Sequence, residues 1–157
     1  MKVAEFIKIF CVELDATYKI HPYSSFALLC SAIELLGKCL DDEHEFETYS
    51  ASLSSRQFNS AIRLMSVKYT SLSLHSALRN SMLHTLLVGE TIVLGERDKT
   101  QHKHLESINF DGTIRTVIIL ETFYEDFKSA CNKVLKKIET KELTHPKLKK
   151  EFITIKE

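Results

Sequence analysis

Apolar side chains near the start of the chain recur every three or four positions, which is the period of a helix with one buried face. The pattern predicts a helix over about residues 2–17 and a second over about 23–40. His21 and Pro22 separate them, because proline lacks a backbone N–H and restricts the residue before it. The two stripes consist of Val3, Phe6, Ile7, Phe10 and Leu14, then Phe26, Leu29, Cys30, Ile33, Leu36 and Leu40.

A third helix is predicted to begin at Ser54, after a polar linker that extends to Tyr49. Residues 54–57 fit a capping box, in which a serine oxygen and a glutamine side chain satisfy free N–H groups of the first turn. A fourth helix is predicted over about 73–87, with Ser73 as its cap. It is apolar nearly all round, which is typical of a central helix packed on several sides.

Over residues 88–110 the apolar residues no longer follow a helical period. The β-branched run at 91–94 is bracketed by Gly89 and Gly95, and a weaker apolar segment follows at 105–110. This arrangement predicts a small β-hairpin.

A fifth helix is predicted over about 112–139, where apolar residues alternate at spacings of three and four. Such a heptad-like seam can serve the core or, at one end, a partner helix. The basic tail at 141–157 is predicted to be loosely held. The expected fold is mainly all-α: an antiparallel bundle of about five helices with a small β-hairpin between the last two. We expect one domain over residues 1–157.

Composition agrees with a helical, intracellular protein. With 4 glycines and 2 prolines, the chain has little of the turn punctuation that many-stranded folds need. The four cysteines form no C-x-x-C pair, so we interpret them as free thiols in a reducing compartment. The N-terminus resembles an amphipathic helix rather than a signal peptide, and no apolar run is long enough to span a membrane. These features predict a cytoplasmic location and no membrane partner.

Charge is balanced overall but uneven along the chain. Residues 1–50 hold four lysines and nine acidic residues, whereas residues 128–157 hold nine lysines and four acidic residues. Two solvated faces would explain this, as would a basic tail that contacts phosphate or oppositely charged ends that pair between subunits. The neutral total argues against a dedicated duplex-DNA binder.

Standard phosphate-loop, dinucleotide, zinc-protease and hydrolase motifs are absent from the sequence. His102 and His104 could face the same way on a strand, but without a third ligand nearby they fit a surface loop better than a metal site. We therefore expect neither a metal nor another cofactor.

The candidates for chemistry lie on the fourth helix. Arg79 offers a planar fork of donors that fits phosphate oxygens, and His84 can transfer a proton near neutral pH. Asn80 lies one turn before His84, so its amide could orient the imidazole. His75 and Arg79 share another face at the same spacing.

Arg79 and His84 are five residues apart, which places them roughly 140° apart on a straight α-helix. A shared site would need a swing of the arginine side chain, or a two-fold dimer that brings both helices together. A structural explanation is also open, in which Arg79 pairs with an acid such as Glu34 and His84 is a buried core histidine.

The segment Leu78, Arg79, Asn80, Ser81, Met82, Leu83, His84 resembles the signature of the HEPN (higher eukaryotes and prokaryotes nucleotide-binding) superfamily. That signature is an arginine, then usually a polar residue, with a histidine after about four to six intervening positions. The helix order over about residues 2–140 is also similar to a HEPN bundle.

The resemblance implies an all-α bundle that commonly dimerises and, in active members, cuts RNA without a metal in a cleft shared by two subunits. Carried over, His84 would be the general base or acid, Arg79 would stabilise the charged transition state, and Asn80 would hold the hydrogen bonds of the site. The hypothesis is a homodimeric endoribonuclease, such as a toxin or defence component with an antitoxin or other protein partner. The alternative is a non-catalytic bundle that dimerises and binds nucleotide, RNA or protein.

Overall fold

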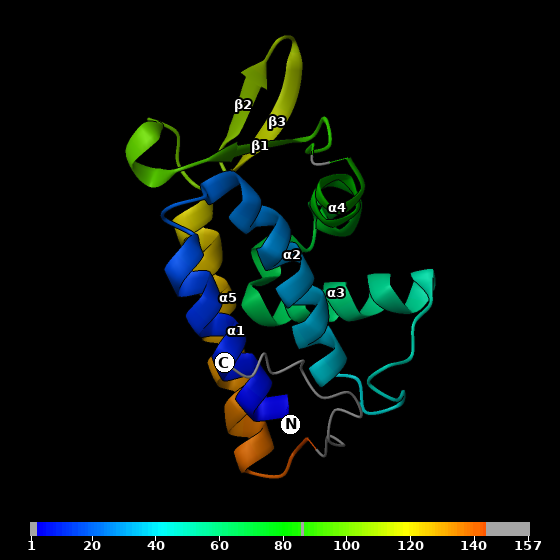
Figure 1. Cartoon of the computed structure of the whole chain (residues 1–157). Helices are drawn as coiled ribbons and strands as arrows, with labels where there is room; N and C mark the ends of the chain where they lie inside the picture. Colours follow the sequence, from blue (N-terminus) through cyan, green and yellow to red (C-terminus); the bar gives the residue numbers. More distant parts are fainter. Residues whose placement is uncertain (1–2, 86, 144–157) are drawn as a thin grey trace.

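The computed structural model describes residues 3–85 and 87–143, in which five α-helices pack together and a small sheet stands at one end (Figure 1). The predicted basic tail at 141–157 lies outside the described residues from position 144 onward. The helices are α1 (Val3–Thr17), α2 (Pro22–Cys39), α3 (Ala51–Met65), α4 (Ser81–Thr85) and α5 (Leu120–Glu139).

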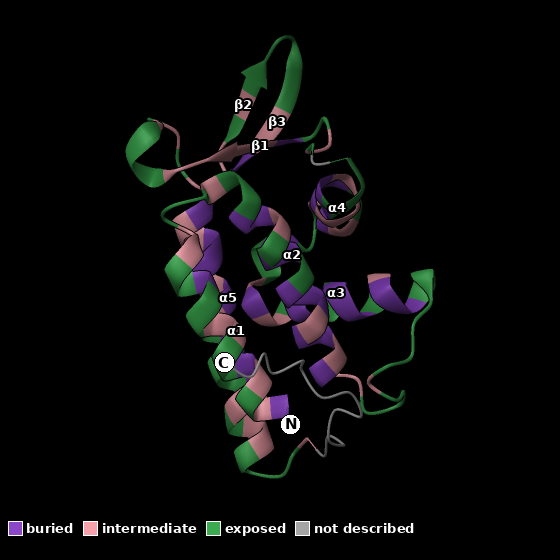
Figure 2. Cartoon of the chain, viewed as in Figure 1, coloured by how far each residue is buried: buried purple, intermediate pink, exposed green. Residues whose placement is uncertain are grey.

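The first two predicted helices are confirmed by α1 and α2, to within about a residue at each described end. Their apolar stripes face inward, where Figure 2 shows buried residues along the facing sides of the helices. The predicted seam of the last helix also serves the core, because its members within α5 up to Val134 are buried. These members are Leu120, Tyr124, Phe127, Cys131 and Val134.

The close packing of α2 against α3 depends on Gly37. A Cβ atom at this position would lie 1.8 Å from the carbonyl oxygen of Gln57, which is far inside any allowed contact. Only glycine therefore lets the two helices approach this closely. The close approach places the Gln57 backbone of α3 against the last turn of α2.

The prediction of an all-α bundle with one hairpin over 88–110 was wrong. The strands β1 (Ile92–Gly95), β2 (Ser107–Phe110) and β3 (Thr113–Ile119) form a mixed sheet in the order β1-β3-β2. β2 and β3 are antiparallel, whereas β1 pairs with β3 in parallel. The fold is mostly helical with a three-stranded sheet between α4 and α5.

Local turn chemistry explains the difference. Asp111 and Gly112 connect β2 to β3, and both have positive φ values, of 49° and 80°. An Asp-Gly pair with two left-handed residues is a favoured turn for a tight hairpin. The β-branched run after it therefore continues as strand β3, and α5 begins at Leu120 rather than near position 112.

Two other helix predictions need correction. α3 begins at Ala51 and is capped by Ser50, whose side chain accepts a hydrogen bond from Leu53 N–H at 3.2 Å. The expected capping box at 54–57 is not formed, and those residues lie inside the helix. The predicted helix over 73–87 is a π-helical segment, His75–Asn80, followed by the short α4.

A partly buried hydrogen-bonded chain attaches the loop before β2 to the helices. The Tyr69 hydroxyl donates to Asp126 Oδ2 at 2.5 Å and lies 2.8 Å from His104 Nε2. The backbone N–H of Ile119 donates to His104 Nδ1 at 3.0 Å, so this nitrogen carries no proton. The neutral ring therefore has its proton on Nε2, which donates to the Tyr69 oxygen.

This arrangement predicts acid sensitivity. Burial lowers the pKa of His104 below its ordinary value of 6.5, against the opposing charge of Asp126. Below pH 6.5 the unfolded chain takes up this proton more readily than the folded chain. The free energy of unfolding should thus fall as the pH drops through that value, until the folded ring is itself protonated.

The measurement is urea unfolding at several pH values between about 7.5 and 5.5. His104→Asn keeps an acceptor for Ile119 N–H but cannot take up a proton, so its stability should depend less on pH than that of the wild type. Equal pH dependence of the two proteins would rule out His104 as the source.

Candidate functional site

The polypeptide around the predicted site is wound more loosely than an α-helix. Residues His75–Asn80 form a π-helical turn, and Ser81 Oγ donates to Ser76 O at 3.1 Å. The carbonyl of Ala77 instead accepts from Gly89 N–H at 2.7 Å, so the chain beyond α4 folds back against this turn. Single π turns occur often at functional sites, because they redirect side chains locally.

Arg79 is held by a salt bridge to α2. Its Nε and Nη2 atoms lie 2.8 and 2.7 Å from Glu34 Oε2, and its Nη1 donates to Asn80 Oδ1 at 2.9 Å. The Arg79 and Glu34 side chains are only 12% and 11% exposed. The structural explanation of Arg79 considered from the sequence, a pair with Glu34, is therefore present in the fold.

His84 lies apart from this cluster. Its side chain is exposed and makes no hydrogen bond or ion pair with any residue in the described part of the chain. The Asn80 amide oxygen binds Arg79 rather than the imidazole. The structure thus brings Arg79 and Asn80 together but leaves His84 outside, and the idea of a buried core histidine is wrong.

A second histidine, His75, lies in the same π-helical segment as Arg79. Its ring packs edge-on against Phe58, with centroids 5.5 Å apart, and its Nε2 is buried without a hydrogen-bond partner among the described residues. Burial lowers the pKa of His75, and the positive charge of Arg79 lowers it further. This histidine is therefore biased toward its neutral form.

An apolar groove runs beside the cluster, between α2 and α4. Its volume is about 350 Å³, and exposed apolar side chains stand along it, with Tyr23 48%, Leu28 45% and Leu83 38% exposed. The lining residues are Tyr23, Ser24, Ala27, Leu28, Ser31, Met82 and Leu83. This groove was not predicted from the sequence. Tyr23 and Leu28 lie off the predicted core stripe of their helix, and this second apolar face is the signal that could have indicated it.

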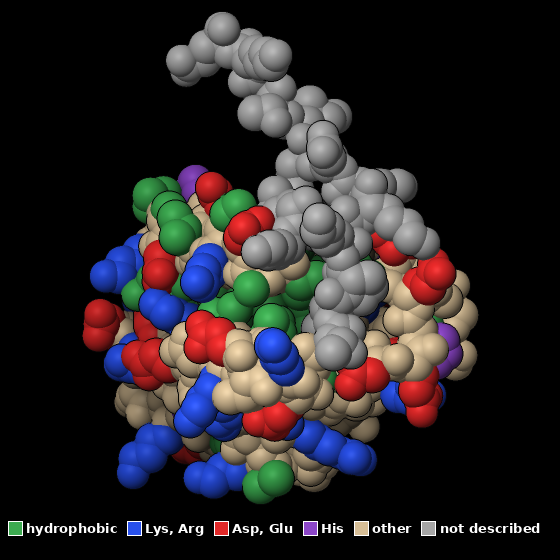
Figure 3. Space-filling model, turned by 90° about the horizontal axis from the view of Figure 1, so that it is seen from below, with side chains coloured by type: hydrophobic (Ala, Val, Ile, Leu, Met, Phe, Trp, Pro, Cys, Tyr) green, Lys and Arg blue, Asp and Glu red, His purple; other side chains and the backbone are tan. Residues whose placement is uncertain are grey.

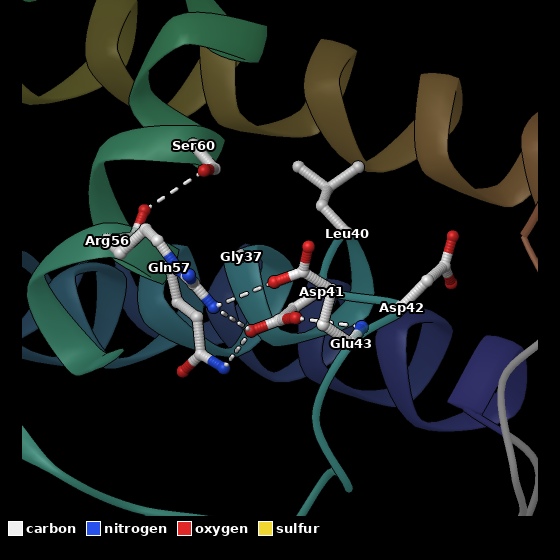
Figure 4. A pocket seen from close by; sticks show the side chains of 8 residues that line it. All are labelled: Gly37, Leu40, Asp41, Asp42, Glu43, Arg56, Gln57 and Ser60. Carbon is white, nitrogen blue, oxygen red and sulfur yellow. Dashed lines mark hydrogen bonds and ion pairs between the residues drawn. The ribbon is translucent and has the colours of Figure 1, made fainter.

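A larger cavity of about 400 Å³ opens between the end of α2 and α3 (Figure 4). Asp41 lies within it and receives hydrogen bonds from Gln57 Nε2 at 3.0 Å and Glu43 N–H at 3.1 Å. Burial raises the pKa of Asp41, but these bonds and one from His44 outweigh it and hold the pKa at about 2. The sequence pattern predicted only a polar linker here, because the partners of this acidic segment come from a different helix.

Three groups at this cavity have the chemistry of cation ligands. Oxygen or nitrogen atoms of Asp41, Glu43 and His44 lie within 4.8 Å of one another. The Arg56 guanidinium stands among them, with Nη2 3.1 Å from His44 Nδ1, 3.5 Å from Asp41 and 3.6 Å from Glu43. Arg56 thus supplies the positive charge at this cluster.

The two histidines considered from the sequence do not converge. His104 turns inward to Tyr69, whereas His102 Nδ1 lies 3.4 Å from a Glu106 carboxylate oxygen. Over the described residues on the face seen in Figure 3, basic and acidic side chains intermix. Such mixing is typical of a solvated surface rather than of a phosphate-binding patch. Within the described residues, no helix is long and apolar enough to cross a membrane.

Comparison with protein-family models, with curated proteins and with solved structures gives no match for this chain. The features that bear on function are the contacts of Arg79 and Asn80, the exposure of His84 and the apolar groove beside them.

The contacts predict a large loss of stability on substitution of Arg79 and almost none on substitution of His84. Arg79→Met should lower the free energy of unfolding by about 3–5 kcal/mol, because it leaves the buried Glu34 carboxylate unpaired. His84→Ala should change it by less than about 0.5 kcal/mol. Urea unfolding measures both, and Arg63→Met, at an exposed arginine on α3, is the matched control. Equal losses for Arg79→Met and Arg63→Met would contradict the buried pair.

Proposed function

We propose that this protein is a non-catalytic, HEPN-like helical domain that self-associates through the groove between α2 and α4. The observation that supports this most directly is the exposed apolar set along the groove, Tyr23, Leu28 and Leu83. Contiguous apolar surface on two neighbouring helices is typical of an interaction site. Each such side chain contributes about 1.5–3 kcal/mol when it goes from exposed to fully buried.

A second copy of the chain is the partner that fits this face. Ser24, Ala27 and Ser31 are small residues on the exposed side of α2, and small side chains allow another helix to approach closely. A two-fold contact would place the same face of each copy against the other, so one apolar set covers its equivalent. The HEPN resemblance also implies dimers.

The contacts of Arg79 favour a binding role for the protein over a catalytic one. Glu34 neutralises its charge, and three of its five N–H donors are used within the chain. A phosphate would have to displace a buried carboxylate before it could use the guanidinium fork, which is costly. In the folded chain Arg79 thus joins two helices rather than facing a substrate.

Sedimentation velocity tests self-association. We expect the wild type to sediment with twice the 18.0 kDa mass of one chain. Leu28→Glu and Leu83→Glu should each shift it to the monomer, because a charge in a buried apolar contact is unfavourable. Val12→Glu, at an apolar residue that is 65% exposed on α1, is the control and should stay dimeric. A monomeric wild type at concentrations well above the micromolar range would overturn the proposal.

RNA cleavage is the second candidate function, and the exposure of His84 favours it. His84 lies on α4, which lines the groove, and its ring has no partner among the described residues. In a dimer its imidazole would take the proton of a ribose 2′-hydroxyl, whose oxygen would attack the phosphorus. The bond from phosphorus to the 5′-oxygen would break, and that oxygen would take a proton from water. The products would be a cyclic phosphate and a 5′-hydroxyl end.

Incubation of the pure protein with a mixed RNA pool in EDTA separates the two functions. The non-catalytic proposal expects no cleavage, and equal results for wild type and His84→Ala. Cyclic-phosphate ends that disappear in His84→Ala but persist in His21→Ala would overturn it in favour of the nuclease. His21 is a suitable control, because it is exposed and makes no side-chain cap at α2.

A further inference from the structure

Helices α1 and α5 run antiparallel beside each other (Figure 1). Side-chain pairs join them along a seam. The rings of Tyr18 and Tyr124 lie with centroids 5.0 Å apart. One turn away, Lys128 Nζ lies 3.0 Å from Asp15 Oδ1. Because the helices are antiparallel, residues earlier in the first helix pair with residues later in the last helix. Successive pairs are three or four residues apart, which keeps the side chains on one helix face.

The next pair along this seam is Cys11 with Cys131. Cys11 lies four residues before Asp15, and Cys131 lies three residues after Lys128. The register set by the Asp15–Lys128 and Tyr18–Tyr124 pairs places these two cysteines opposite each other, and the Tyr124 hydroxyl donates to the Cys11 carbonyl oxygen at 3.1 Å. Cys11 is partly exposed and Cys131 is buried. The Cys11 thiol can thus meet a reagent from solution, while Cys131 belongs to the core beside it.

We infer that Cys11 and Cys131 form a reactive dithiol, which closes to an intramolecular disulfide when it meets a small disulfide such as oxidised glutathione. In this assignment Cys11 is the attacking thiol and Cys131 the resolving thiol. The site is separate from the groove between α2 and α4, and it does not depend on the proposed function.

The surroundings of Cys11 favour its thiolate. The hydrogen bond from Cys131 lowers the pKa of Cys11 and outweighs burial, and the positive charge of Lys128 lowers the pKa further, against that of Asp15. A partly exposed thiol with a lowered pKa and a second cysteine in contact is the arrangement of redox-sensitive sites.

The reaction balances as a thiol–disulfide exchange. The Cys11 thiolate attacks one sulfur of oxidised glutathione, which forms a mixed disulfide and releases one glutathione thiolate. Cys131 then loses its proton to that thiolate and attacks the Cys11 sulfur, which releases the second glutathione. The two cysteines lose two electrons and two protons, and the glutathione disulfide gains them as two thiols.

The second step is helped by the first. The largest cause that raises the pKa of Cys131 is its hydrogen bond with Cys11, followed by burial. Formation of the mixed disulfide removes the negative charge of Cys11, so Cys131 then ionises more easily. The other two cysteines are less available, because Cys30 and Cys39 are both 0% exposed and burial raises the pKa of Cys39 to about 12.

Peptide mapping of the full-length protein tests the assignment. Tryptic cleavage after lysine and arginine places each cysteine in a separate peptide: 9–19, 20–38, 39–56 and 129–133. After treatment of the folded protein with oxidised glutathione and alkylation, peptide 9–19 should be linked to 129–133. Peptides 20–38 and 39–56 should carry the alkyl label, and the intact mass should fall by two hydrogens.

Variants separate the two steps. Cys131→Ser should stop at a stable glutathione adduct on Cys11, whereas Cys11→Ser should react at neither position. Cys39→Ala, at a buried cysteine outside the pair, should still form the link. Circular dichroism confirms that each variant is folded. A persistent adduct on Cys11 in the wild type, a link that involves peptide 20–38 or 39–56, or the absence of any reaction would overturn the inference.

Discussion

The buried ion pair between Arg79 and Glu34 is the interaction on which the arrangement around the candidate site depends. It joins α2 to the π-helical turn, and two charges held this deep in a protein must stay paired. The pair therefore fixes how the turn sits on α2, and through it the position of α4 and the groove beside it. The same contact uses Arg79, the arginine of the signature, to hold two elements together. One ion pair therefore bears both on the fold and on the role of Arg79 at the candidate site.

The sequence predicted α1 and α2 well, because their apolar stripes are strong and local. It predicted the sheet poorly, because Val117, Ile118 and Ile119 fit a helical period as well as a strand, and the decision depends on partners elsewhere. The turn at Asp111 and Gly112 was a readable local signal for β2 and β3. The parallel pairing of β1 with β3 has no such local signal, because β2 and the loops on either side of it lie between these two strands in the sequence.

At the candidate site, the pairing of Arg79 with Glu34 could be anticipated, because a buried arginine needs an acid and α2 offers one on its inner face. The exposure of His84 could not. A helical wheel advances about 100° per residue, whereas a π turn advances less, so every side chain after Asn80 is rotated from its expected direction. Leu83 consequently reaches the surface, 38% exposed, while Met82 is fully buried. The acidic cavity depends on Gln57, a residue whose partner follows only from the tertiary packing.

The seam between the first and last helices has a consequence for how the chain is made. The contact from Tyr124 to Cys11 spans 113 residues, so it forms only after almost the whole domain has left the ribosome. Until then the side of α1 that α5 covers remains open to solvent. Synthesis thus leaves an apolar strip of the first helix uncovered for most of the time that the chain is growing, and chaperone binding during translation would act there.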